Sequence, residues 1–224
     1  AEAFAAHGSL REVRMPQNGI RMEGVIALAK GLAKNPGMQY IDLQDNAFSV
    51  DGALSGIEAW TEALKSWPEL HTLNLSDCLI STEGEVPELV KALVKGSNPK
   101  LKTLQLQNNN FKSDTFGLLA GSISTTLKNI MRLELQWNEV DEDDEHVETL
   151  RDSLKQRGGK LIATDDDEEE DEEEKAEEEG EEEEEIKHSA PIVAEAIREE
   201  EKEPTKTNDD ATDDLISKLS QVKI

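Results

Sequence analysis

The chain is poor in the residues on which several common kinds of protein depend. Its 224 residues include a single cysteine, Cys78, so an internal disulfide is excluded and a reducing compartment is favoured. Aromatic residues make up 4% of the sequence. No apolar run approaches the roughly 20 residues that a membrane-spanning helix needs. We therefore expect a protein that neither crosses a membrane nor depends on disulfides.

The sequence also lacks the patterns of catalytic, cofactor and metal sites. Its four histidines, His7, His71, His146 and His188, have no metal-ligand spacing, and Cys78 has no zinc partners. Phosphate-binding loops, dinucleotide fingerprints and nucleophile elbows are missing as well. We predict no catalytic residues, no cofactor and no metal, and expect the function to lie in a binding surface.

Charge is distributed unevenly along the chain. Residues 165–224 hold 27 acidic and 7 basic side chains, and residues 1–164 hold 23 and 17, so −20 of the net charge of −26 lies beyond residue 164. Such a chain repels nucleic acid and anionic membranes and favours basic partners. Every residue of 165–185 except Lys175, Ala176 and Gly180 is Asp or Glu, and we expect disorder there. We expect 186–224 to be a disordered tail with a short helix near its end, where apolar residues recur at helical spacing.

One short phrase recurs five times in residues 1–164. Its clearest form is Leu101-x-x-Leu104-x-Leu106-x-x-Asn109-x-Phe111, and the matches start near residues 10, 38, 70, 101 and 130. The intervals between these starts are long and slightly unequal. The position two residues before the last apolar residue, which we call the slot, holds Asn18, Asn46, Cys78, Asn109 and Asn138. This is the leucine-rich repeat pattern, in which the slot residue satisfies backbone groups of the turn and Cys78 is expected to be buried.

An amphipathic helix is predicted in the second half of each repeat. Apolar residues at spacings of three and four predict helices over 22–34, 51–66, 84–96, 113–127 and 142–157. Leu161 and Ile162 are expected to close the core behind the last of these. The fold class is thus α/β, a leucine-rich repeat horseshoe with long, ribonuclease-inhibitor-like repeats, parallel strands inside and helices outside. Ala3, Phe4 and Ala6 lead into Gly8 like the end of a further helix, so we expect the repeat domain, 1–164, to be truncated at its N terminus.

The predicted partner surface lies on the inner face of the strands. Side chains between the apolar strand positions point away from the helices because strand side chains alternate. They are acids and amides, with the aromatic Trp137 at one end, and we expect Trp137 to be exposed. The candidate partner-binding residues are Gln17, Asp42, Gln44, Asp45, Asp77, Gln107, Glu134, Gln136 and Trp137.

Five phrases go beyond the generic repeat. They are Met15-Pro-Gln-Asn-Gly-Ile20, Ile41-Asp-Leu-Gln-Asp-Asn46, Ala63-Leu-Lys-Ser-Trp-Pro-Glu-Leu70, Leu75-Ser-Asp-Cys-Leu79 and Leu133-Glu-Leu-Gln-Trp-Asn138. Together with the acidic run after long repeats, they resemble the Ran GTPase-activating protein family. Because little sequence follows the acidic run, the chain resembles the fungal form, and it corresponds to the C-terminal part of the repeat domain plus the tail.

The resemblance implies a GTPase activator for the small GTPase Ran. Such an activator supports nucleocytoplasmic transport by keeping cytoplasmic Ran in the GDP form. It is not an enzyme with its own active site, because it acts on the active site of its partner. The family's key Asn and Arg come from earlier repeats, so this chain is expected to supply part of the surface for GTP-bound Ran without them. A Ran-binding protein is a further partner that the resemblance allows, and we expect a cytoplasmic monomer.

Three other interpretations remain open. An acidic-tailed repeat module for basic proteins such as histones shares the order of parts, but its repeats are shorter. A plain scaffold of the ribonuclease-inhibitor type is disfavoured by the single cysteine. An enzyme with its own active site has no residue constellation to support it.

Overall fold

The computed structural model describes residues 1–164 and 167. Apart from Asp167, the predicted acidic run and tail, 165–185 and 186–224, lie outside the described residues. Helices and strands alternate throughout the described part. In chain order they are α1 (Glu2–His7), β1 (Glu12–Arg14), α2 (Met22–Leu32), β2 (Tyr40–Asp42), α3 (Ser55–Leu64), β3 (Thr72–Asn74), α4 (Glu88–Val94), β4 (Thr103–Gln105), α5 (Ser113–Ile123), β5 (Arg132–Glu134), α6 (Glu145–Lys155) and β6 (Lys160–Ile162). None of these helices combines the length and hydropathy needed to cross a bilayer.

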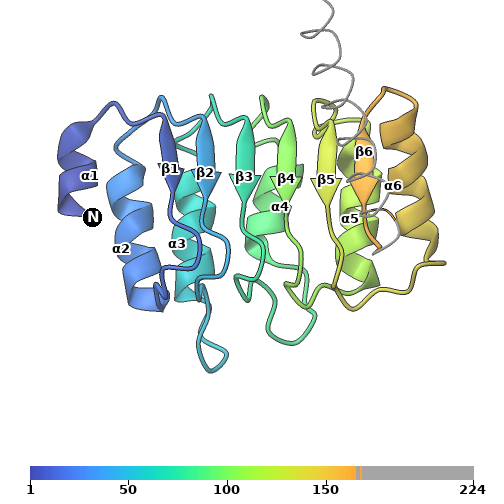
Figure 1. Cartoon of the computed structure of the whole chain (residues 1–224), viewed down its shortest axis with the longest axis horizontal. Coiled ribbons are helices and arrows are strands. Elements are labelled where there is room, and N and C mark those ends of the chain that lie inside the picture. Colours follow the sequence, from blue (N-terminus) through green and yellow to red (C-terminus); the bar gives the residue numbers. More distant parts are fainter. Residues whose placement is uncertain (165–166, 168–224) are drawn as a thin grey trace, which may run out of the picture. The chain divides into compact units, whose positions relative to one another are not determined.

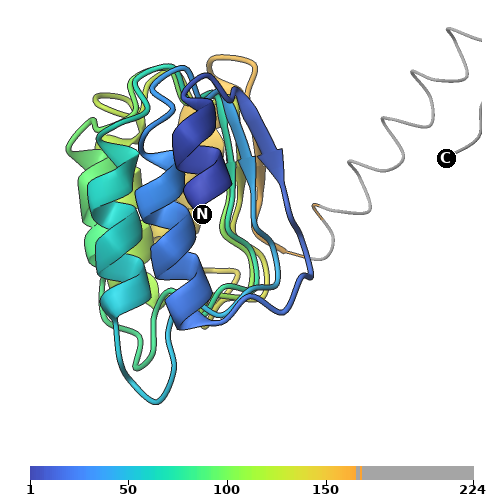
Figure 2. The ribbon, with the colours of Figure 1, turned by 90° about the vertical axis from the view of Figure 1, so that its left-hand side faces the viewer.

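All six strands form one parallel sheet in chain order, from β1 to β6. One apolar residue from each strand aligns across it: Val13, Ile41, Leu73, Leu104, Leu133 and Leu161. Figure 1 shows the strands side by side, and Figure 2 shows the helices gathered on one face of the sheet. The predicted leucine-rich repeat architecture, with parallel strands on one layer and helices on the other, is confirmed.

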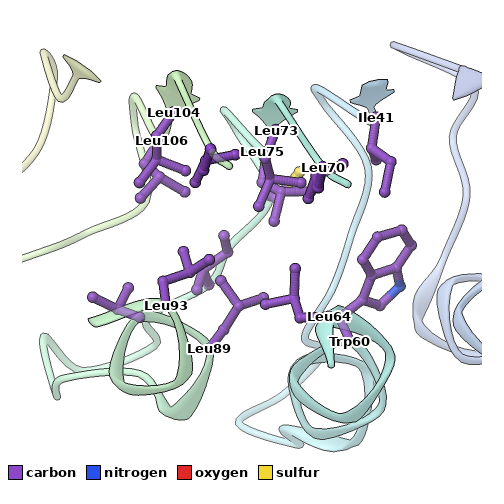
Figure 3. Packing of buried hydrophobic residues seen from close by; sticks show 14 of the residues in the cluster. Ile41, Trp60, Leu64, Leu70, Leu73, Leu75, Leu89, Leu93, Leu104 and Leu106 are labelled. Atoms are coloured by element: carbon purple, nitrogen blue, oxygen red, sulfur yellow. The ribbon is translucent and has the colours of Figure 1, made fainter. Parts of the chain in front are cut away.

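The core lies between the two layers. Strand residues such as Leu73 and Leu104 face helix residues such as Leu64 and Leu89, and all four are fully buried (Figure 3). Burying one leucine fully stabilises a fold by about 1.5–3 kcal/mol relative to leaving it exposed. Because these contacts join strands to helices, they hold the two layers together.

Two tryptophans add hydrogen bonds to this core. Trp60 packs between Phe48 and Trp67, with ring centroids 5.4 Å from each neighbour. The indole Nε1 of Trp60 donates to the carbonyl of Val25 at 3.0 Å, and that of Trp67 donates to the carbonyl of Leu32 at 3.1 Å. Both bonds reach into the preceding repeat. Both tryptophan side chains are completely buried.

Helices α3 and α4 each begin four residues later than predicted. Helix α3 begins at Ser55 rather than 51, because Asp51 and Gly52 adopt φ values of 50° and 77° in a turn closed by Ala53 N–H donating to the carbonyl of Val50 at 2.9 Å. An Asp-Gly pair with two positive φ values is the signature of a tight reversal. Helix α4 begins at Glu88 rather than 84, after Pro87 at its N-cap. In both repeats the turn residues, rather than the spacing of apolar residues, determine where the helix begins.

The last strand and Asp167 complete the described fold. Leu161 and Ile162 are buried as expected, and they belong to β6, which the sequence did not predict as a strand. The Asp167 carboxylate accepts from the backbone N–H groups of Ala163 at 3.0 Å and Thr164 at 3.1 Å, and from Arg151 Nη2 at 2.9 Å. Burial alone would raise the pKa of Asp167, but these hydrogen bonds hold its pKa below the ordinary value. Asp167 therefore fastens the end of β6 to helix α6.

The slot asparagines join consecutive repeats. Asn109 Oδ1 accepts from the N–H groups of Cys78 and Ile80, each at 3.1 Å, and its Nδ2 donates to the carbonyl of Leu75 at 2.9 Å. Asn138 makes the same arrangement in the next repeat, where its Oδ1 accepts from the N–H groups of Asn109 and Phe111. The structural role predicted for the slot is confirmed at these positions, since one side chain satisfies several backbone groups of its neighbour.

We predict that Asn109→Ala lowers the free energy of unfolding by roughly 3 kcal/mol. The substitution leaves two buried N–H donors and one carbonyl without their partner, and each such orphan costs about 1–3 kcal/mol before relaxation. Urea unfolding followed by circular dichroism measures the change. Asn18→Ala is the matched control, because exposed Asn18 makes only a local bond from Nδ2 to the carbonyl of Pro16 within the described residues. Equal losses in the two variants would contradict the role assigned to the slot.

Candidate partner-binding face

The strand face opposite the helices carries the predicted partner residues. At the end of each of the first five strands the chain turns through one residue with positive φ. These residues are Gln17 (54°), Asp45 (56°), Asp77 (54°), Asn108 (49°) and Trp137 (60°). We call them the rim residues. The backbone N–H groups of the first four continue the parallel ladder, as where Asp45 N–H donates to the carbonyl of Ser76 at 2.9 Å. The turn is therefore alike from repeat to repeat, although the side chains that it presents differ.

The strand face itself is crossed by a chain of side-chain hydrogen bonds. Asn74 Nδ2 donates to Gln44 Oε1 at 3.4 Å, and its Oδ1 accepts from the N–H of Ser76 at 3.0 Å. The Ser76 hydroxyl donates to Gln107 Oε1, and Gln107 Nε2 donates to Glu134 Oε2 at 2.6 Å. We call this chain, from Gln44 to Glu134, the polar lattice. Asn74, Ser76, Gln107 and Glu134 are hydrogen-bonded along the polar lattice, which leaves these side chains fewer donors and acceptors for a partner.

Glu134 is the acceptor at one end of the polar lattice. Its carboxylate accepts from Gln105, Gln107 and Arg132, and the residue is only 4% exposed. A carboxylate this deeply buried is expected only when it is paired and hydrogen-bonded, as here. The sequence offered one signal of the ion pair, the spacing of Arg132 and Glu134, which places both side chains on the same face of β5.

The nine predicted residues fall into three groups by exposure. Gln17, Asp45 and Trp137 are exposed, with Trp137 at 55%, which confirms the exposure predicted for it. Asp42, Gln44, Asp77 and Gln107 are half-buried. Glu134 and Gln136, expected in exposed columns, are 4% and 1% exposed, and this expectation is corrected. Glu134 is covered because the polar lattice draws its side chain against the sheet.

Charge on the accessible part of the face is negative. Asp45 is exposed, and Asp77 is half-buried with one carboxylate oxygen accepting from Asn108 Nδ2. Arg14 provides a cation at the N-terminal edge, where its guanidinium lies 4.3 Å from the Tyr40 ring centroid and pairs with Glu12. The hydrogen bond from Arg14 to Glu12 raises the pKa of Arg14. Within residues 1–164, no group of three or more His, Cys, Asp or Glu side chains is placed to hold a metal ion.

Cys78 is the thiol in the repeat slot. It is fully buried, and its Sγ lies 3.2 Å from the carbonyl oxygen of Leu43 and 3.3 Å from that of Ser76. Burial raises the pKa of Cys78 to about 12. The neutral thiol donates to the backbone of the preceding repeat, which is the part that Asn plays in other slots. The burial predicted for Cys78 is confirmed.

The chain is similar to Ran GTPase-activating protein 1 from Saccharomyces cerevisiae, with 32% identity over 146 residues. The resemblance to the Ran GTPase-activating protein family is confirmed. The matched residues are 63% of this chain but only 35% of the yeast protein, so the chain spans about a third of the length of that Ran GTPase-activating protein. No protein-family model matches the chain.

The ion pair of β5 has an exposed counterpart in β1. Glu134 and Arg132 have side chains 6% and 28% exposed, whereas Glu12 and Arg14 are 53% and 59% exposed. We predict that Glu134→Ala lowers the free energy of unfolding by roughly 3 kcal/mol, because the donor groups that now bond to the buried carboxylate would lose their acceptor. Glu12→Ala should cost less than about 1 kcal/mol. Chemical denaturation of both variants checks the contrast, and a similarly small loss for Glu134→Ala would count against the polar lattice.

We further predict that Cys78 resists alkylation in the folded protein. The thiolate is the reactive form, and a pKa of about 12 leaves almost none of it near pH 8. Iodoacetamide labelling followed by mass spectrometry should be at least about 100-fold slower than in urea-denatured protein. The raised pKa also means that the stabilisation from the neutral thiol is complete below the ordinary thiol pKa and is lost as pH rises toward 12. Rapid native labelling at pH 8 would show that the slot opens.

Proposed function

We propose that this chain is part of a GTPase activator for Ran and supplies a portion of the surface that binds GTP-loaded Ran. The observation that carries the proposal is the 32% identity to a Ran GTPase-activating protein over 146 residues, on a repeat fold that leaves one strand face and its rim outside the core. In the cell, such an activator would keep cytoplasmic Ran in the GDP form and so support nucleocytoplasmic transport.

The mechanism follows from the kind of surface that is present. GTP hydrolysis is accelerated mainly by positioning the attacking water and by stabilising charge in the transition state. The resemblance to GTPase-activating proteins assigns the chemistry to the GTPase active site, with this chain acting through the surface that it presents. Exposed carboxylates such as Asp45 would attract a basic surface of Ran, raising the association rate in a salt-dependent way. The family's key Asn and Arg are assigned to repeats that precede those of this chain.

A second candidate is a binding module for basic proteins such as histones. The acidic excess of the whole chain, −26, favours it. The two functions differ in a way that can be measured, because charge attraction to histones is indifferent to nucleotide, whereas recognition of Ran by an activator depends on the GTP state.

We predict GTP-selective binding to Ran. Biolayer interferometry with the full chain compares Ran loaded with a non-hydrolysable GTP analogue and Ran loaded with GDP. Binding to the first should weaken as salt rises from about 50 to about 200 mM, because the Debye length then shrinks from roughly 14 to roughly 7 Å. Neutralising Asp45 and Asp77 together (Asp45→Asn, Asp77→Asn) should slow association roughly threefold to tenfold at low salt.

A control variant changes charge equally on the helix layer. Glu62→Gln with Glu148→Gln removes two exposed carboxylates from α3 and α6 and should leave the association rate within about twofold. In single-turnover assays the chain should accelerate hydrolysis little. Nucleotide-independent binding, matched by equal binding to histones, would favour the second candidate, and strong acceleration of hydrolysis would contradict the placement of the key residues in other repeats.

A further inference from the structure

The unequal repeat lengths have a structural location. The connection from β2 to α3 runs over 43–54 and that from β3 to α4 over 75–87, whereas the corresponding connections in neighbouring repeats run only over 15–21 and 106–112. The extra length of the repeats that start at 38 and 70 therefore lies in the β2–α3 and β3–α4 loops. Figure 1 shows both loops extending past the other loops at that edge of the sheet.

These two loops expose apolar side chains. Val50 is 41% exposed, Leu54 36% and Leu79 46%, and they are three of the five large hydrophobic residues that are exposed in the described part of the chain. Val50 and Leu79 line one hollow of about 380 Å³, and Leu54 lines a neighbouring one of about 420 Å³ whose floor includes Ile57 and Ile80. We call Val50, Leu54, Leu79 and the two hollows the loop patch.

Leu79 is held in a backbone conformation that suits it poorly. Its φ is 53°, in the left-handed region, where a residue with a Cβ is disfavoured. Positions directly after the slot with positive φ carry Gly19 and Asn110 in other repeats, residue types that tolerate this conformation. A strained backbone and an exposed apolar side chain each oppose folding, so neither explains why leucine stands there.

Both loops are fixed by their own contacts. The turn at Asp51 and Gly52 closes the first loop. In the second, the Glu85 carboxylate accepts from the N–H groups of Thr82 at 3.2 Å and Glu83 at 2.9 Å. Lys112 Nζ donates to the carbonyl of Glu83 at 3.1 Å and holds the loop against the next repeat. A surface that is ordered before binding loses less conformational entropy when a partner docks.

Acidic side chains border the loop patch. Asp51, Glu58 and Glu85 are exposed beside it, and Lys91, which lines the larger hollow, is paired with Glu88 at 2.8 Å. The apolar floor of the larger hollow, bordered by carboxylates, is complementary to an aliphatic side chain flanked by Lys or Arg. The loop patch also continues the rim, since Leu79 closely follows the rim residue Asp77 along the chain. The side chains of the polar lattice on the strand face, in contrast, are bonded to one another.

We propose that the loop patch is the main anchoring surface for the GTPase, and that it receives an aliphatic side chain flanked by basic residues on GTP-loaded Ran. This inference rests on the proposed function and assigns the binding strength to Leu79 and Val50 rather than to the strand face. Apolar anchors in preformed hollows usually dominate binding strength, while charges at the border set the rate of encounter.

The test uses a substitution that removes the anchor and relieves the strain. Leu79→Gly deletes the exposed side chain and places glycine at a φ that it adopts readily, so its thermal midpoint should equal or exceed that of the parent chain. Its affinity for Ran loaded with a non-hydrolysable GTP analogue should fall roughly tenfold, chiefly through faster dissociation. Val50→Thr should add a further loss of about threefold, and Asp51→Asn should slow association without changing the backbone, because Asn tolerates positive φ.

Met131→Ala is the matched control. Met131 is 40% exposed, but it precedes β5 and so lies at the N-terminal ends of the strands, whereas the loop patch lies beyond their C-terminal ends. Its removal should therefore leave the affinity for Ran within about twofold. If the parent chain binds Ran and Leu79→Gly binds equally well, the anchoring role of the loop patch is overturned while the proposed function stands. If the parent chain is folded and binds Ran in neither nucleotide state, the proposed function fails, and the loop patch fails with it.

Discussion

The whole fold depends on backbone groups of one repeat being satisfied by the next. Each strand is very short, too short to bury an apolar face alone, and its ladder is completed by neighbouring strands. Beyond the strands, slot side chains satisfy backbone groups of the neighbouring repeat, as Asn109 does by accepting from the N–H groups of Cys78 and Ile80. Tryptophan does so on the helix side, where Trp60 and Trp67 donate to carbonyls of the preceding repeat. Packing and hydrogen bonding therefore repeat with the same period, and this shared period fixes the register of the sheet.

The sequence was informative wherever one residue type has one structural meaning. The recurring apolar phrase predicted the first five strands, because the same slots must face the same core. It also predicted that Cys78 is buried and that Trp137 is exposed. Helix starts were less predictable, since apolar periodicity continues into loops where Asp51-Gly52 or Pro87 decides the boundary. Strand β6 was missed because it follows the last repeat and lacks the full phrase.

Predicting the candidate site was harder, because burial of polar groups depends on partners far apart in sequence. Glu134 is covered through Gln105 and Gln107, which come from the preceding repeat. Alternation places all of these side chains on one face, but it does not say whether they turn to solvent or to one another. Leu79 shows the reverse case, since a leucine directly after the slot gives no signal of exposure or of a positive φ until the turn is seen. The local pattern thus identified the face, and the structure separated its buried residues from its exposed ones.

Asp167 bears on where the repeat domain ends. By composition it belongs to the acidic run that begins at 165, yet its carboxylate is bound by Ala163, Thr164 and Arg151. A recombinant chain cut where the composition changes, after residue 164, would lose the clamp between β6 and α6 and expose the edge of the last repeat. Expression boundaries for repeat proteins with charged extensions are therefore better chosen from the last side chain bonded to the fold than from the first residue of the extension.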